Sequence, residues 1–283
     1  MTLKEDKNKI KSGLYVVSTP IGNLRDITFR ALDILKISEI ILCEDTRVSK
    51  KLLSYYDIQT KLISNHKFNE KKNLDKVIDF LNQDKIVSMI SDAGTPTISD
   101  PGRFLINRCI KENIKIVPIP GPSAITTSMS ISSFSDQFYF HGFLSGKVNS
   151  IKKEFAIFNN LKCSIVFFIS AQKLRKQFEM LKEFFLEREI LICREMTKIH
   201  ESFYRGKMSE INNFNFIPKG EVTVIISGKK NDDLKENLNE SDKKKIKMLI
   251  QNNTIKDIVR IISREKNISK SKIYNYCLKI KNE

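Results

Sequence analysis

The chain has 283 residues, of which 41% are hydrophobic, so it is long enough to build two domains with apolar cores. Its 49 Lys and Arg outnumber its 33 Asp and Glu, and the net charge of +16 favours an anionic partner, most often nucleic acid.

No apolar run approaches the ~18 residues that a membrane span needs, and the charged first eleven residues do not resemble a signal peptide. The five cysteines are scattered without C-x-x-C spacing, which argues against zinc and against a disulfide framework. We therefore expect a cytoplasmic protein with no membrane anchor and no metal.

Strands and helices are expected to alternate through the first half of the chain, after a disordered basic tail at 1–12. Apolar runs predict strands at 13–18, 39–43, 86–90 and 115–118, and helical spacing predicts helices between them. The first helix is expected to be capped by Asp26 or Thr28, and the later ones cover 47–56, 69–82 and 103–112. A last helix, which Pro122 would start, runs through Ser130. This alternation is typical of a mostly parallel sheet whose loops gather at one edge.

Three of these strands run into loops that contain both Pro and Gly, at 19–24, 92–102 and 119–124, which we call the first, second and third Pro-Gly loops. Ligands of open α/β sheets bind at the carboxyl ends of the strands, where these loops lie. Glycine permits close approach of a ligand, and proline reduces the entropy that the loop loses on binding. The alternative is a proline-stiffened turn without a ligand. The repetition of the pattern favours a binding site.

Polar residues also follow the predicted strands, and each has a structural alternative. Asp45 follows the strand 39–43 and either serves a site or caps the next helix. Asp92 either faces a ligand or bonds the amides of its own loop. His66 is one of three histidines and either functions or is simply solvated.

A second domain is expected at 132–228, after a first domain at 13–131. Strands are predicted at 137–141, 163–170, 190–194 and 220–227, with helices near 150–160, 172–186 and 207–213. Residues 229–283 then hold fifteen Lys and Arg against eight Asp and Glu, a net charge of +7. Two short helices around a turn are predicted there, which either contact RNA phosphates or pack on the rest of the protein.

Several cofactor motifs are absent from the sequence. No G-x-G occurs, which argues against a nicotinamide or flavin fingerprint, and 142–148 fall short of a P-loop because Val148 replaces the Ser or Thr that binds magnesium. No G-x-S-x-G marks a serine nucleophile.

Several motifs together resemble the family of bacterial small-subunit ribosomal RNA methyltransferase I, within the tetrapyrrole methylase superfamily. They are STPIGNL (18–24), EDTR (44–47), SDAGTP (91–96), DPG (100–102), PGPSA (120–124), GFL (142–144), REMTK (194–198) and GE (220–221). The resemblance covers 13–228, with departures at Ser145 and at 167–173, where the family has a Glu and a His that this chain lacks.

The resemblance implies two α/β domains of tetrapyrrole-methylase type with S-adenosylmethionine in the cleft between them, plus a small helical C-terminal appendage. It implies methylation of a cytidine 2′-hydroxyl in 16S rRNA, naked or in the small ribosomal subunit, by a homodimer. By match to the family motifs, cofactor binding falls on the following residues: Pro20, Gly94, Thr95, Pro96, Ile98, Ser123 and Ala124.

Transfer of a methyl group to a ribose hydroxyl needs close alignment and benefits from a general base. Asp45, Asp92 and His66 are our candidates for catalysis, and Arg25, Arg47 and Lys67 are basic loop residues that could meet RNA phosphates. Two alternatives stay open: a methylase of a small tetrapyrrole or a protein residue on the same fold, and a non-enzymatic nucleic-acid-binding protein.

Overall fold

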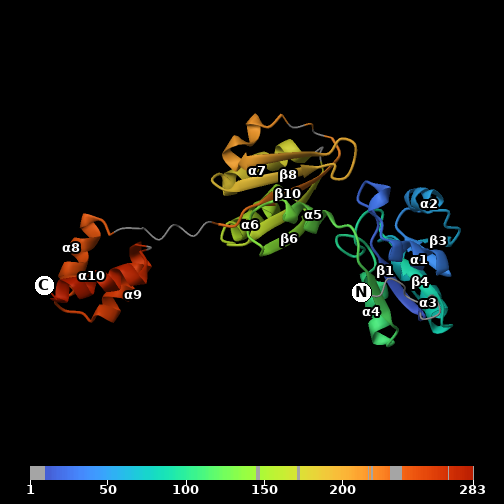
Figure 1. Cartoon of the computed structure of the whole chain (residues 1–283), viewed down its shortest axis with the longest axis horizontal. Helices are drawn as coiled ribbons and strands as arrows, with labels where there is room; N and C mark the ends of the chain where they lie inside the picture. The colour runs from blue at the N-terminus through green and yellow to red at the C-terminus, as the bar shows by residue number, and fades with distance from the viewer. Residues whose placement is uncertain are drawn as a thin grey trace. The chain divides into compact units, whose positions relative to one another are not determined.

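The computed structural model describes residues 10–144, 147–170, 173–215, 217, 219–229, 238–266 and 268–282. Residues 1–9 of the predicted tail, Ser145 and residues 171–172 of the family departure lie outside this description. The chain divides into two compact units, residues 1–159 with 163–227 and residues 160–162 with 228–283 (Figure 1). The first unit contains two five-stranded sheets, and the second contains helices.

The first sheet has five parallel strands in the order β3-β2-β4-β1-β5. They are β1 (Gly13–Val17), β2 (Ile40–Cys43), β3 (Lys61–Ser64), β4 (Ile86–Met89) and β5 (Ile116–Ile119). In β1, Leu14 lies opposite Val87 on one side and Ile116 on the other. Strands buried on both faces read as continuous apolar runs, and that pattern made β1, β2, β4 and β5 visible in the sequence. The edge strand β3 is partly exposed and was not predicted. The predicted parallel sheet is confirmed.

Helices cover both faces of this sheet. They are α1 (Phe29–Ile37), α2 (Thr46–Tyr55), α3 (Glu70–Asn82) and α4 (Arg103–Lys111). Alternate residues of β1 face opposite ways: Val17 packs in the apolar cluster with α1 and α2, and Leu14 packs in the cluster with α3 and α4. Thr28 caps α1 by accepting a hydrogen bond from the N–H of Ala31, whereas Asp26 belongs to a short 3-10 helix, η2 (Leu24–Asp26).

The strand order creates a topological switch point between β1 and β4. The chain leaves β1 toward β2 and leaves β4 toward β5, in opposite directions along the sheet. The helices that follow, α1 and α4, pack on opposite faces. Ligands of open α/β sheets bind in the crevice at such a point. The first and second Pro-Gly loops emerge from these two strands.

The second sheet has the order β6-β7-β10-β8-β9, and only β6 and β7 are parallel neighbours. Its strands are β6 (Phe138–Phe143), β7 (Ser164–Ser170), β8 (Glu189–Arg194), β9 (Ser202–Lys207) and β10 (Glu221–Ile226). Helices α6 (Val148–Phe158) and α7 (Leu174–Phe185) and the 3-10 helix η4 (Met208–Asn213) accompany them. The edge strand β9 was not predicted, because its alternating residues are only half buried and few are apolar.

An apolar cluster joins the first Pro-Gly loop to the second sheet. Helix α5 (Ala124–Ser130) contributes Ile125, the loop contributes Ile21, and the sheet contributes Val166, Leu191 and Ile225. Ser123 is the N-cap of α5, so Pro122, which we expected at the start of this helix, lies just before it. The cluster fixes the first and third Pro-Gly loops against the sheet.

The described residues of the second unit form three helices, α8 (Glu240–Leu249), α9 (Ile255–Lys266) and α10 (Lys270–Asn282). Two of them were predicted, and α8 was missed because its sequence, rich in Lys, shows little apolar periodicity. Ile246, Ile258, Ile262, Ile273 and Cys277 form an apolar cluster within this unit. It therefore has a small core of its own.

Candidate functional site

The three Pro-Gly loops meet, as the sequence predicted. Thr19 and Gly94 exchange backbone hydrogen bonds of 2.9 and 3.0 Å, which tie the first loop to the second. The Thr95 hydroxyl lies 3.1 Å from the hydroxyl of Ser18 and donates to the carbonyl of Pro122 at 3.4 Å. Residues far apart in sequence thus hold one another in place around the switch point.

The second loop has a strained backbone. Gly94 and Gly102 have φ angles of +76° and +128°, which only glycine adopts readily. Thr97 and Ser99 also have φ of 71°, an uncommon conformation for residues with a side chain. Such conformations persist where the surrounding structure enforces them, and they concentrate at ligand sites.

A cavity of about 410 Å³, the first cavity, opens beside this loop. It is lined by Ile21, Asp92, Ala93, Gly94, Thr95, Ile98, Ser99, Asp100, Ser123, Ala124, Ile125, Phe143, Phe168, Ile169, Ser170, Gly220, Glu221, Val222 and Thr223. Its volume is within the range of sites for small molecules. Its wall combines apolar side chains with the carboxylates of Asp92, Asp100 and Glu221.

Five of the seven residues predicted to bind a cofactor line the first cavity. They are Gly94, Thr95, Ile98, Ser123 and Ala124. Pro20 lines a second cavity, and Pro96 is buried beneath the loop. The wall contributed by β7 and β10 was not predicted, because the short apolar runs of those strands carry no sign of a ligand. Of the sequence motifs, only GE at 220–221 belongs to that wall, and no role was predicted for it.

The carboxyl groups around this cavity are electrostatically coupled. Burial raises the pKa of Asp100 to about 6, and the negative charges of Glu44 and Asp92 act in the same direction. Partial desolvation also raises the pKa of Asp92, although the N–H of Asp45 donates to its Oδ1 at 3.1 Å. Desolvation and the charge of Asp92 likewise raise the pKa of Glu44. These groups bind protons more readily than ordinary carboxylates do.

Asp45 differs from these carboxylates because its side chain is engaged. Its oxygens accept from the guanidinium of Arg47, with one contact of 2.6 Å, and from the backbone N–H of Arg47 at 2.8 Å. The bonds with Arg47 lower the pKa of Asp45 to about 2. Asp45 is also the N-cap of α2, so the capping alternative from the sequence is realised in the structure. It lines neither cavity.

The second cavity, of about 250 Å³, adjoins the first. Both are lined by Ile21, Asp92, Ala93 and Glu221. The second cavity is also bordered by α2, through residues such as Ser49 and Lys51, and by Lys198. Asp92 therefore faces both spaces.

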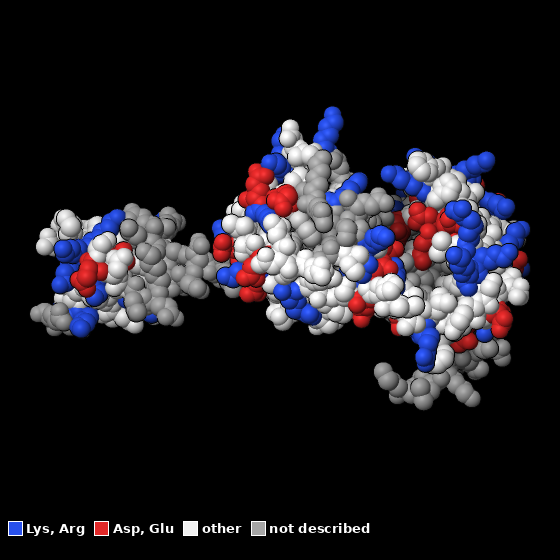
Figure 2. All heavy atoms as spheres, turned by 90° about the horizontal axis from the view of Figure 1, so that it is seen from above, with Lys and Arg blue, Asp and Glu red and all other residues white. Residues whose placement is uncertain are grey.

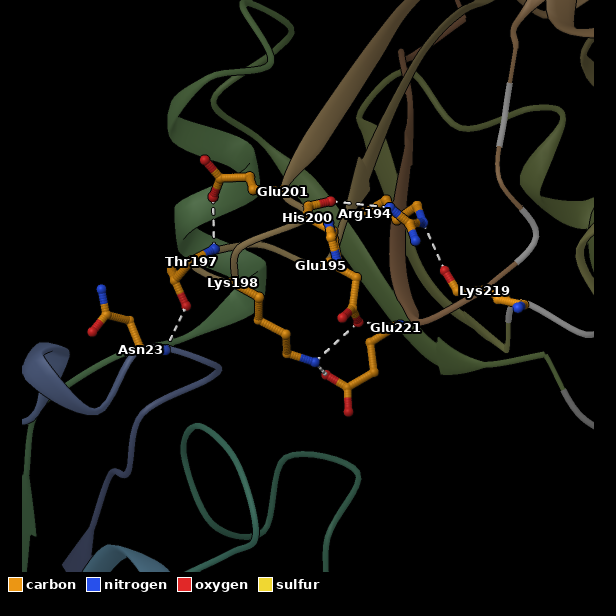
Figure 3. A network of polar contacts seen from close by, with 9 residues as sticks. All are labelled: Asn23, Arg194, Glu195, Thr197, Lys198, His200, Glu201, Lys219 and Glu221. Atoms are coloured by element: carbon orange, nitrogen blue, oxygen red, sulfur yellow. Dashed lines mark hydrogen bonds and ion pairs between the residues drawn. The ribbon is translucent and has the colours of Figure 1, made fainter. Parts of the chain in front are cut away.

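Lys198 lies between two carboxylates in the network that Figure 3 shows. Its Nζ lies 3.0 Å from Oε1 of Glu195 and 3.1 Å from Oε2 of Glu221. The N–H of Glu221 also donates to Oε1 of Glu195, at 2.8 Å. The ammonium of Lys198 compensates the negative charge of Glu221, which lines both cavities. Lys198 belongs to the REMTK motif at 194–198.

The loop that carries Lys198 is bound to the first Pro-Gly loop. The N–H of Asn23 donates to the hydroxyl of Thr197 at 3.0 Å (Figure 3). A Cβ on Gly22 would lie 2.5 Å from Cγ of Lys198 and 2.9 Å from the carbonyl oxygen of Met196. This close approach is possible only because residue 22 is glycine.

The other predicted site residues lie outside the two cavities. His66 accepts the N–H of Phe68 on its Nδ1 at 3.2 Å and lies close enough to Glu44 to influence its titration. Arg25, Arg47 and Lys67 are exposed. Figure 2 shows Lys and Arg side chains gathered over the first-sheet part of the chain, next to a smaller acidic patch.

Metal-ligand clusters and membrane-spanning helices are both absent from the described residues. In that part of the chain, no three His, Cys, Asp or Glu side chains form a group that could hold a metal ion. No described helix is both long and apolar enough to cross a bilayer.

The chain is similar to proteins of known families. Residues 13–212 match the model of the tetrapyrrole (corrin/porphyrin) methylases. A protein of Mesomycoplasma conjunctivae named ribosomal RNA small subunit methyltransferase I is 46% identical, over 78% of this chain and 94% of its own length. Proteins of the same name from Thermotoga maritima and Neisseria meningitidis are 44% and 34% identical, and the latter alignment covers 99% of this chain and 98% of the relative.

Two solved structures share the fold. A uroporphyrin-III C-methyltransferase of Thermus thermophilus aligns with a TM-score of 0.56 at 14% identity, over 76% of this chain and 93% of that one. A cobalt precorrin-4 methyltransferase aligns with a TM-score of 0.58 at 16% identity, over 80% and 98%. At these identities the likeness establishes the two-sheet α/β architecture.

Proposed function

The chain belongs to the tetrapyrrole methylase family and, within it, to the ribosomal RNA small subunit methyltransferase I proteins, and we propose that it transfers the methyl group of S-adenosylmethionine to the 2′-hydroxyl of a cytidine ribose in 16S rRNA. The observation that carries the proposal is the first cavity, which the three Pro-Gly loops enclose at the switch point of the first sheet. The names of the relatives support the RNA substrate class.

The residues of the first cavity suit S-adenosylmethionine. Apolar groups of Ile98, Ile125 and Phe168 offer a surface for an adenine ring. The carboxylates of Asp92, Asp100 and Glu221 suit the cationic parts of the molecule and its ribose hydroxyls. When bound, S-adenosylmethionine supplies a methyl group that its sulfonium has already activated.

We place the acceptor ribose in the second cavity. Asp92 faces both cavities and is therefore the side chain best placed near the reacting atoms. The acceptor oxygen forms its bond to the methyl carbon while the bond from sulfur to that carbon breaks, and Asp92 accepts the hydroxyl proton. Holding the acceptor within about 3–3.5 Å on a straight line supplies most of the rate, and the base adds roughly 10²–10⁴-fold.

Asp45 acts in this proposal as a positioning residue. Its pKa of about 2 makes it a weak base, but its N–H holds the Asp92 carboxylate at 3.1 Å. His66 lies outside the two cavities but close enough to Glu44 to influence its titration, and we assign it to substrate contact. The exposed cations of Arg25, Arg47 and Lys67 are proposed to meet RNA phosphates.

The remaining proposals concern the setting of the reaction. The substrate is the 16S rRNA, naked or within the small ribosomal subunit, and the enzyme works in the cytoplasm as a homodimer. The five cysteines are free in the structure, which suits a reducing compartment. The resemblance to the family supports the dimer.

Calorimetry tests the proposed donor site. Wild-type protein is expected to bind S-adenosylmethionine, and Gly94→Val is expected to lose at least tenfold in affinity, because a β-branched side chain at φ +76° displaces the loop. Thr126→Val, on an exposed position of α5, serves as the control. Absence of binding by the wild type, or equal affinity of a folded Gly94→Val variant, would contradict the assignment.

A further inference from the structure

The ring of Phe68 projects into solvent from a loop that is firmly held. The residue is 93% exposed, an unfavourable position for a large apolar side chain. The loop is nevertheless ordered by specific bonds: Oδ1 of Asn69 accepts the N–H of His66 at 2.7 Å, and the amides of Asn69 and Asn73 both donate to the carbonyl of Ser64, at 3.1 and 2.7 Å. The ring is therefore displayed on a rigid support.

This ring is connected to the acidic residues through His66. Its neighbour His66 makes an edge contact with it, at 6.0 Å between ring centroids. His66 in turn lies close enough to Glu44 to influence its titration, and the hydroxyl of Ser64 donates to the carbonyl of Glu44 at 3.3 Å. These contacts connect the loop that carries Phe68 to the strand end that carries Glu44.

Several lysines lie close to Phe68 in the sequence. Lys67, Lys71 and Lys72 are all exposed. The Nζ of Lys71 lies 4.9 Å from the ring centroid of Phe104, which is itself 49% exposed. Exposed rings interleaved with cations are the arrangement that binds single-stranded nucleic acid: the rings stack on bases and the cations meet phosphates.

We propose that Phe68 is a stacking platform for an unpaired base of the RNA substrate, next to the nucleotide that is methylated. This inference rests on the proposed function. RNA is recognised mainly where its bases are unstacked, and an aromatic ring replaces the stacking energy that the splayed base loses. The positive surroundings favour an RNA over a protein or a second copy of this chain.

Steady-state kinetics with unmethylated small ribosomal subunits test the platform. Phe68→Ala should raise KM roughly 5- to 150-fold, the range for loss of one stacked base. Phe68→Tyr and Phe68→Trp should restore KM, because both keep a stacking face. Phe29→Ala is the matched control, since Phe29 is 89% exposed and lines neither cavity.

A second measurement does not depend on turnover. The chain has no tryptophan, so Phe68→Trp introduces a single fluorescent reporter. Short single-stranded oligocytidylate should quench its emission, and should leave the emission of Phe29→Trp unchanged. An equal response of both reporters would contradict stacking at residue 68.

The results separate this proposal from the function on which it rests. If the wild type does not methylate rRNA, the proposed function fails. If the wild type methylates rRNA and Phe68→Ala keeps its KM within twofold, only the platform is wrong. The platform is also overturned if Phe68→Trp is as impaired as Phe68→Ala, or if Phe68→Ala changes the oligomeric state on gel filtration, which would mean that a second copy covers the ring.

Discussion

Neighbouring carboxylates in this protein have opposite protonation behaviour, and their immediate contacts explain the difference. Asp45 is bonded to Arg47 and has a pKa of about 2, whereas Asp100 is half-buried among like charges and has a pKa of about 6. The sequence placed Asp45 and Asp92 close to a site but could not rank them, because the ion pair and the capping bond of Asp45 appear only in the structure.

Substitution separates the two aspartates. Asp92→Asn is expected to lower kcat roughly 10²–10⁴-fold with little change in cofactor affinity, because a base acts in the transition state. Asp45→Asn is expected to lower kcat less than tenfold, since it keeps the backbone N–H that holds Asp92 and weakens only the bonds between the Asp45 side chain and Arg47. Single-turnover rates and calorimetry on both variants check this ranking. An Asp92→Asn variant with wild-type turnover would move the base elsewhere.

The raised pKa of Asp100 predicts a pH-dependent effect on stability. Its folded-state pKa of about 6 exceeds the ordinary value, so the ionised form opposes folding above pH 6 and the opposition disappears below about pH 4. Asp100→Asn should therefore stabilise the protein at pH 8, by on the order of 1 kcal/mol after solvent screening. The gain should shrink as the pH falls through 6. Urea unfolding of both proteins across pH 4–8 measures it, and a gain that grows toward acid would contradict the assigned shift.

At the scale of elements, apolar periodicity predicted most strands and helices. The elements that were missed contain many polar residues and lack a clear apolar pattern. The buried strands of the first sheet are continuous apolar runs, so their positions followed from the sequence. Strands β3 and β9 are partly exposed and α8 is rich in Lys, so none of the three shows a strong pattern. Which strands pair depends on contacts between residues far apart in the sequence. The strand order and the antiparallel pairs of the second sheet were therefore not predictable from local patterns.

The candidate site shows the same division between local and long-range information. The three Pro-Gly loops were visible because Pro and Gly act on their own backbone. The carboxylate of Glu221, the ammonium of Lys198 and the ring of Phe168 reach the cavities only through the packing of the second sheet. No local pattern marks such residues, and only the resemblance to a family pointed to the segments that carry two of them.

At the scale of the whole molecule, the charge is concentrated in a unit with its own core. Residues 229–283 carry a net charge of +7, about twice their even share of +16, and α8, α9 and α10 share one apolar cluster. We interpret this unit as one that binds RNA phosphates through its Lys and Arg side chains. The alternative is that the helices pack on the rest of the protein or on a dimer mate.

Removal of residues 229–283 distinguishes these interpretations. RNA affinity should fall, and the slope of its logarithm against the logarithm of salt concentration should flatten, because fewer counterions are released. Cofactor affinity should stay within twofold. Titrations of full-length and truncated protein across a salt series measure both quantities. An unchanged slope, or a truncated protein that no longer folds, would favour packing.

The central claim is that this protein methylates one ribose of 16S rRNA, and mass spectrometry of that RNA tests it most directly. The 16S rRNA is isolated from a strain that lacks the gene, and from the same strain carrying either the wild-type gene or Asp92→Asn. We predict that one cytidine loses a ribose methyl group in the deletion strain, regains it with the wild-type gene, and does not regain it fully with Asp92→Asn. Identical 16S rRNA with and without the gene, or a missing methyl group on a base instead of a ribose, would contradict the account.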